Sequence, residues 1–521
     1  MEYSFRLLTF NPTDAINEIS RKKDFVVQMF GINELGETAS FFVNGYKPFF
    51  YVKVGDNWTE ADRVGFISQL SADMGEYHED SIIDSSFAKR KKLYGFDGGK
   101  EHTFIMISFI NESAMKKAKQ LWYIQGPVKG DDQELSKSGY IFEETPTILY
   151  EAHIPPLLRL FHINEISPSG WISIDKKCVT NHAKKQTTCT YEFSVDFKNV
   201  ISQPDKETLV PYKICSFDIE ASSSHGDFPL PVKNYKKLAT NIIDICSPDG
   251  AYYETSCTED LLKMLILSSF GLSDDKNQNV DLVYPIKKVS LEQVQALFNK
   301  WIKICPSKYV GETRLNEDDI EDTSRYHINQ DCELDDESDD EKLQGESEPE
   351  FNWNMFKPKP QSYKKKGSIV DMLNDVESSR DTLLIELTRT LTDVFPTLNG
   401  DKVTFIGSTF IKYGDVKPYL NHCIALNTCD DVTNAVIHRC TSEKEVLLEW
   451  SNLIQKENPD IIIGYNIFGF DYNFMYLRAK ELKCEREFLQ LSRNIKEVCL
   501  EKNWKTGKEG LSESTIQLAS G

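Results

Sequence analysis

The chain has 521 residues, of which 40% are hydrophobic and 11% aromatic. This length exceeds what one hydrophobic core supports, so we expect two or three domains. The formal net charge of −21 excludes a uniformly basic surface, but a local basic groove is still compatible with it.

Much of the negative charge lies in one acidic tract, residues 317–350. This tract holds sixteen Asp and Glu residues against two basic ones, a net charge of −14 that leaves −7 for the rest of the chain. It has almost no apolar periodicity, and such composition cannot bury enough surface to offset the entropy of ordering. We therefore expect a disordered surface loop here.

Twelve cysteines are scattered along the chain without a C-x-x-C pair. This spacing, with no signal peptide, favours reduced thiols and argues against a zinc site and against secretion. No apolar stretch approaches the roughly 20 residues of a membrane span. We therefore expect no membrane association.

The first part of the chain, residues 1–210, is expected to be a mixed α+β domain. Alternating or continuous apolar runs predict strands, and helical spacing predicts two helices, the second with Asn111 as its N-cap. The expected strands are Phe25–Phe30, Ser40–Asn44, Pro48–Val54 and Phe104–Phe109, and the expected helices are Trp58–Met74 and Glu112–Trp122.

The second part, residues 211–521, is expected to hold a mixed sheet interrupted by an insertion at about residues 232–400. The insertion should contain helices at Glu259–Phe270, Leu291–Ile304 and Ser368–Phe395. Outside it we expect strands Tyr212–Ile219, Val403–Phe410, His422–Leu426 and Ile461–Gly464, and helices Ser442–Lys456 and Asp471–Leu482. The β-β-β-α-β-α order with carboxylates at strand ends predicts a ribonuclease H-like sheet flanked by helices, so the fold class is α/β and α+β.

Three carboxylates are expected to meet at one edge of this sheet. Asp218 and Glu220 point the same way because side chains alternate along a strand. Asp471 lies where a strand gives way to a helix, so it can converge on that pair. Such a group is tolerable only around divalent cations, and two ions about 3.5–4 Å apart are what phosphodiester hydrolysis by water requires.

The motifs around these carboxylates carry a family resemblance. Ser216–Glu220 (SFDIE) resembles the first exonuclease motif of the family B DNA polymerases, and Gly464–Asp471 (GYNIFGFD) resembles the second. Tyr150–Arg159 is similar to the end of the N-terminal domain in these enzymes, and Lys402–Phe410 to the next exonuclease strand. The resemblance is to the eukaryotic delta type and, more closely, to the enzymes of large DNA viruses.

The resemblance implies roles for the motif residues. Asp218 would bridge two Mg²⁺ or Mn²⁺ ions, Glu220 would hold the ion that activates water, and Asp471 would hold the second ion, partly through water. Asn466 would bond near the primer terminus and also cap the following helix. Phe470 would lie against the terminal bases.

Three further residues are expected to contact DNA. Phe217 directly precedes the first carboxylate. Lys89 and Arg90 belong to a basic run, Lys89–Lys92, that could touch a DNA backbone. The alternative for this run is a solvated turn.

The third exonuclease motif, Y-x-x-x-D, and the polymerase motifs are not found in the sequence. We therefore expect an N-terminal domain and an incomplete 3′–5′ exonuclease domain of a longer replicative DNA-directed DNA polymerase, with the polymerase domain absent and the fragment inactive alone. The alternatives are a free-standing 3′–5′ exonuclease and a catalytically inactive DNA-binding scaffold.

The resemblance also implies partners and a place of action. The expected partners are primer–template DNA, a single-stranded 3′ end, deoxynucleotides and a sliding clamp or processivity factor. The expected location is the nucleus or a viral replication site in the host cytoplasm.

Deleting residues 317–350 is predicted to shift the melting temperature by less than about 3 °C, because a tract that buries little contributes little to stability. Differential scanning calorimetry of the chain with and without the tract measures this. A much larger fall would show that the tract is docked on the folded protein.

Overall fold

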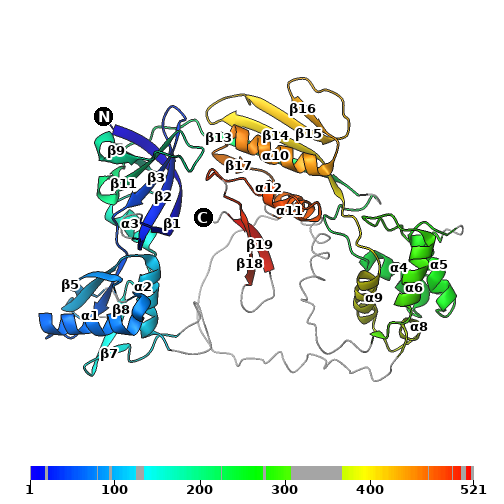
Figure 1. Ribbon diagram of the computed structural model, residues 1–521, viewed down its shortest axis with the longest axis horizontal. Helices are drawn as coiled ribbons and strands as arrows, with labels where there is room; N and C mark the ends of the chain where they lie inside the picture. The colour runs from blue at the N-terminus through cyan, green and yellow to red at the C-terminus, as the bar shows by residue number, and fades with distance from the viewer. Residues whose placement is uncertain are drawn as a thin grey trace, which may run out of the picture.

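A computed structural model describes residues 2–17, 21–78, 80–92, 97–124, 134–223, 226–273, 277–306, 367–467, 469–495, 497–505 and 512–517 (Figure 1). The acidic tract 317–350 lies outside these residues. Figure 1 shows an N-terminal unit rich in strands, a helical unit, and a C-terminal sheet covered by helices.

The N-terminal unit contains two sheets with separate cores. The larger sheet has the order β10-β11-β3-β2-β1-β9-β12, and the smaller has the order β5-β6-β4-β8-β7. The first is built from β1 (Glu2–Ile16), β2 (Lys23–Ile32), β3 (Thr38–Asn44), β9 (Trp171–Asp175), β10 (Val179–Asn181), β11 (Tyr191–Asp196) and β12 (Ile201–Gln203). The second is built from β4 (Phe49–Lys53), β5 (Ile82–Lys91), β6 (Glu101–Phe109), β7 (Tyr140–Phe142) and β8 (Thr145–Tyr150).

The helices of this unit are α1 (Glu60–Met74), α2 (Glu112–Lys119) and α3 (Pro156–Ile163). Asn111 caps α2 as expected, since its side chain accepts the Ala114 N–H at 2.8 Å. The last turn of the expected helix is a 3-10 helix, Gln120–Trp122. The expected strands are present, but the sequence did not indicate β1, whose polar residues and Pro12 break the alternation.

The helical unit lies inside the expected insertion. It comprises α4 (Lys236–Cys246), α5 (Glu259–Ser269), α6 (Leu291–Trp301), α8 (Ile369–Leu373) and α9 (Arg380–Val394), which share one hydrophobic core. Trp301 is fully buried in it and donates a hydrogen bond to Thr390 at 3.1 Å. The helical spacing expected over Ser368–Phe395 corresponds to two helices: α8 ends at Leu373 with Asn374 as its C-cap, and the Ser379 side chain starts α9 by accepting the Thr382 N–H.

The C-terminal sheet has the order β16-β15-β14-β13-β17. Its strands are β13 (Lys213–Ser222), β14 (Lys402–Lys412), β15 (Leu420–Leu426), β16 (Val436–Cys440) and β17 (Ile461–Ile463). β13 is antiparallel to β14 and parallel to β17, while β15 is parallel to β16. The expected mixed ribonuclease H-like sheet is confirmed, with β16 as an additional edge strand.

Helices cover one face of the C-terminal sheet (Figure 1). These are α10 (Glu443–Glu457), α11 (Asp471–Glu481) and the short α12 (Glu485–Phe488). They are followed by the hairpin β18 (Leu500–Lys505) and β19 (Ser512–Gln517). Trp450 of α10 is fully buried and packs on Phe217, with ring centroids 4.8 Å apart. No helix in the described ranges is long and apolar enough to cross a bilayer.

The separate core of the helical unit generates a prediction. Leu387 is fully buried there, so Leu387→Ala should destabilise this unit by about 2–5 kcal/mol. Hydrogen exchange measured by mass spectrometry should accelerate in α4, α6 and α9 and stay unchanged in β13 and β14. Equal acceleration in both regions would show that the two cores unfold as one.

Candidate active site

Strand β13 presents the first carboxylates on its exposed face. Phe217 and Ile219 are buried under the helices, at 3% and 6% exposure, so Asp218 and Glu220 project to the other, open face. β17 pairs with β13 only as far as Ser216. The next part of β13 therefore has a free edge on that side.

Asp471 occupies this free edge. Its Oδ1 accepts the Ile219 N–H at 3.3 Å, so the carboxylate takes the place of a missing strand neighbour. Asp471 is only 2% exposed and is the first residue of α11. A carboxylate is favourable at a helix N-terminus because the peptide dipoles direct partial positive charge there.

The turn between β17 and α11 explains the spacing of the second motif. A Cβ on Gly464 would lie 2.2 Å from the Ile467 side chain, so only glycine fits. Asn466 has a φ of +53°, a conformation that asparagine tolerates better than most residues. A Cβ on Gly469 would lie 2.5 Å from Asn466 Oδ1. The turn thus delivers Asp471 to β13 in a fixed position.

The environment of Asp471 opposes its charge. Burial is the main cause that raises the pKa of Asp471 to about 6; the charge and hydrogen bond of neighbouring Asp218 also raise it, while the backbone N–H groups of Asp471 and Ile219 lower it. Two carboxylates in this arrangement repel each other, and a divalent cation would relieve the repulsion. Carboxylate oxygens also suit Mg²⁺ and Mn²⁺, so the residues present fit such an ion.

The structure brings together two of the three predicted ligands. Asp218 and Asp471 are neighbours, while Glu220 lies two residues further along the open face. Within the described ranges, no three His, Cys, Asp or Glu side chains stand close enough together to hold a metal ion. Ligation by Glu220 therefore stays a prediction.

The residues expected at the DNA end, Asn466 and Phe470, belong to the turn that leads into α11. Asn466 is exposed, but it does not cap α11: Phe470 is the N-cap and contributes no side-chain bond, so that expectation is wrong. Instead the Asn466 carbonyl accepts the N–H groups of Gly469 and Phe470. Phe470 is half-buried, with its ring 5.5 Å from that of Phe228. Phe228, 48% exposed, had no expected role; only its place after the first motif pointed to it.

Phe217 is not available to DNA, which corrects the expectation for this residue. It is 3% exposed, and its ring lies 4.8 Å from Trp450 and 5.3 Å from Tyr472. The alternation that directs Asp218 outward necessarily directs Phe217 into the core. Its role is packing.

Lys89 and Arg90 are exposed near the end of β5, an edge strand of the smaller N-terminal sheet. They pair with Thr103 and His102 of β6, so the run is a strand end rather than a turn. They belong to a different sheet from Asp218, and DNA contact by them stays a prediction.

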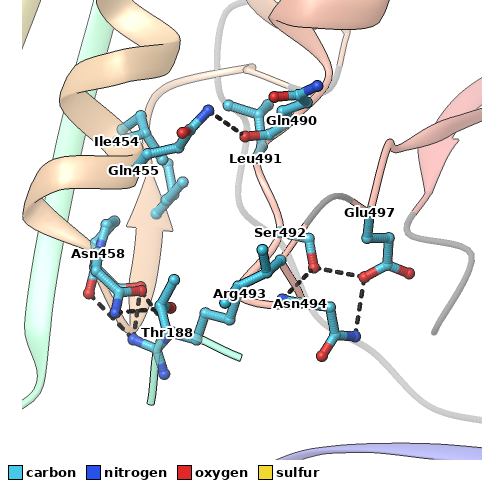
Figure 2. A pocket seen from close by; sticks show the side chains of 13 residues that line it. Thr188, Ile454, Gln455, Asn458, Gln490, Leu491, Ser492, Arg493, Asn494 and Glu497 are labelled. Atoms are coloured by element: carbon cyan, nitrogen blue, oxygen red, sulfur yellow. Dashed lines mark hydrogen bonds between the residues drawn. The ribbon is translucent and has the colours of Figure 1, made fainter. Parts of the chain in front are cut away.

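A pocket of about 340 Å³ marks the junction between the N-terminal unit and the C-terminal sheet (Figure 2). Arg493 lines it and donates to the Asn458 side chain and to Asp460, at 2.9 and 2.6 Å. Asp460 in turn accepts the N–H of Lys213, the first residue of β13. The N-terminal unit joins through Thr188, whose N–H donates to the Arg493 carbonyl. The junction therefore fixes the start of the carboxylate-bearing strand.

A ribonuclease H-like sheet with neighbouring carboxylates, Asp218 on β13 and Asp471 at the start of α11, defines a nuclease-type unit. The family described as DNA polymerase family B, exonuclease domain, matches residues 147–292 and 382–519, more than half of the chain, including Asp218, Glu220 and Asp471. The chain therefore belongs to the family B DNA polymerases, and the resemblance seen in the two motifs is confirmed.

Relatives among curated proteins agree. The DNA polymerase of Phaeocystis pouchetii virus is 41% identical over 99% of this chain and 50% of its own length. The DNA polymerase of Pyramimonas orientalis virus is 28% identical over 94% of this chain and 37% of its own. The DNA polymerase delta catalytic subunit of Dictyostelium discoideum is 24% identical over 42% and 20%. The chain thus spans at most about half the length of these relatives.

The burial of Asp471 predicts that the stability of the metal-free protein, measured in the presence of a chelator, depends on pH. A raised pKa stabilises the fold while the carboxyl is protonated, and this contribution is lost as the pH rises through about 6. The unfolded carboxyl is already largely ionised at pH 5, so the stability of Asp471→Asn relative to the parent chain should rise by about 1.4 kcal/mol between pH 5 and pH 7.5.

Denaturant unfolding with EDTA at the two pH values measures this difference. Asp415→Asn, at an exposed position, is the control. The difference in stability between this variant and the parent should be the same at both pH values. A difference between Asp471→Asn and the parent that is the same at both pH values would contradict the assignment of the charge penalty to Asp471.

Proposed function

We propose that this chain carries the proofreading 3′–5′ exonuclease of a replicative DNA-directed DNA polymerase. The observation that carries the proposal is the buried Asp471 carboxylate, bonded to the backbone of β13 and adjacent to Asp218. It supports metal-dependent hydrolysis because the site concentrates hard oxygen ligands and partly excludes water.

In this proposal Asp218, Glu220 and Asp471 hold two Mg²⁺ or Mn²⁺ ions. When bound, such ions activate a water and stabilise the leaving 3′-oxygen. The chain contributes fixed positions: the Ile219 N–H orients Asp471, and strand alternation keeps Asp218 and Glu220 on one face. Phosphoryl transfer depends mostly on such positioning and charge stabilisation.

The DNA end would lie against Asn466 and the aromatic pair Phe470 and Phe228. Stacking on an aromatic ring tolerates any base, which removal of mispaired nucleotides requires. Lys89 and Arg90 would contact the DNA backbone further away.

The proposed domain organisation follows the structural units. Residues 1–210 form the N-terminal domain, and residues 211–521 form exonuclease structure with the helical unit as an insertion at about 232–400. The polymerase that contains this chain would also bind primer–template DNA, deoxynucleotides and a sliding clamp or processivity factor. It would act in the nucleus or at a viral replication site in the host cytoplasm.

Replacing both Asp218 and Glu220 by Ala should reduce removal of a mispaired 3′ nucleotide more than about a thousandfold, because the ions contribute several kcal/mol to the transition state. Extension of a matched primer by the polymerase should persist, since it uses another site. Primer degradation and extension with Mg²⁺ are measured side by side.

The control is Asp415→Ala with Asp430→Ala, which removes two exposed carboxylates of the same unit. Unchanged degradation by the Asp218 and Glu220 double variant would sink the assignment.

A further inference from the structure

Helix α11 carries a second functional group besides Asp471. Arg478 lies seven residues later, two helical turns along, and is fully buried. Its guanidinium makes two bonds to Glu443, at 2.8 and 2.7 Å, and an ion pair with Glu481 at 2.9 Å. It also donates to the Pro231 carbonyl at 3.0 Å.

The two acids extend these contacts to other elements. Glu443, in the first turn of α10, also accepts the Val403 N–H of β14 at 3.0 Å. Glu481 accepts the Gly400 N–H at 3.3 Å. Removing one member would leave buried charge without a partner, which is strongly destabilising.

Arg478 also contacts both ends of the helical unit. Pro231 lies just before this unit and Gly400 just after it. The ends are joined beside the guanidinium, because Leu230 and Asp401 exchange two hydrogen bonds, at 2.8 and 2.9 Å. A Cβ on Gly400 would lie 1.9 Å from the Pro231 oxygen and 2.2 Å from Arg478 Nη1. These ends and the guanidinium therefore cannot move independently.

The two ends of α11 are held very differently. At its start the Ile219 N–H donates to Asp471 at 3.3 Å and the Tyr472 N–H donates to the Ile467 carbonyl at 3.0 Å, and the N-cap Phe470 makes no side-chain cap hydrogen bond. Near its other end Arg478 makes several charge-assisted bonds, which are the stronger kind. A helix transmits an axial shift along its length, so the position of Asp471 is set from Arg478.

We propose that Arg478 is a positioning residue for the metal site: it sets the approach of Asp471 to Asp218 and couples that approach to the ends of the helical unit. This inference rests on the proposed function. It deepens that function, because it makes the helical unit a point from which the nuclease site can be controlled.

The test measures Mn²⁺ binding to the chain by electron paramagnetic resonance, well below the melting temperature. Arg478→Met should weaken binding about 10–100-fold, the usual effect of removing a residue that orients a metal ligand. Gly400→Ala should also weaken Mn²⁺ binding. Its new Cβ would occupy the space of the Arg478 guanidinium and displace it, although the substitution lies at the end of the helical unit.

Arg159→Met is the matched control. Arg159 is 8% exposed and pairs with Glu151 at 2.7 Å in the N-terminal unit, so its loss lowers stability away from α11. It should leave Mn²⁺ affinity unchanged. Parent-like affinity in both Arg478→Met and Gly400→Ala would overturn the proposal.

A metal-free readout separates this inference from the proposed function. The Ile219 amide donates to Asp471, so its hydrogen exchange should accelerate at least about tenfold in Arg478→Met and Gly400→Ala. If the parent and Asp218→Ala bind Mn²⁺ equally, the proposed metal site is wrong, but the positioning role is still tested by Ile219 exchange. If Ile219 exchange is unchanged in Arg478→Met and Gly400→Ala, the positioning role is wrong. If Arg478→Met does not fold, Arg478→Lys is measured in its place.

Discussion

The buried guanidinium of Arg478 is the interaction on which the C-terminal part of the molecule depends. It joins its own helix α11 to α10 through Glu443 and to the ends of the helical unit through Pro231, and its ion pair with Glu481 lies within α11. Burying these charges costs several kcal/mol per ion unless every partner is in place. The elements around Arg478 are therefore stable together and unstable separately, which makes their relative positions a property of one network.

Local patterns in the sequence brought Asp218 and Asp471 together correctly, while metal ligation by these residues and by Glu220 stays a prediction. The alternation of β13 correctly assigned Asp218 and Glu220 to one face, and Asp471 does lie where a strand gives way to a helix, as expected. The same alternation, applied one residue earlier, would have placed Phe217 in the core. The capping role expected for Asn466 failed because its backbone carbonyl, rather than its side chain, closes the turn.

Other features depend on contacts between distant segments, which a local pattern does not carry. Arg478 looks like a surface residue of an amphipathic helix, and its burial depends on distant partners, Glu443 35 positions earlier and the Pro231 carbonyl. β16 is half polar and forms because β15 provides a partner. α4 and the division between α8 and α9 likewise follow from the shared core of the helical unit and from caps at Asn374 and Ser379.

The paired ends of the helical unit, Leu230 and Asp401, determine how a change in its length affects the sheet. Because the chain leaves and re-enters the C-terminal sheet at bonded neighbours, the sheet is insensitive to how much polypeptide lies between them. The entropy of closing a longer loop grows only slowly with its length. A change in the length of this unit should therefore leave the sheet in place as long as the few residues at its base are kept.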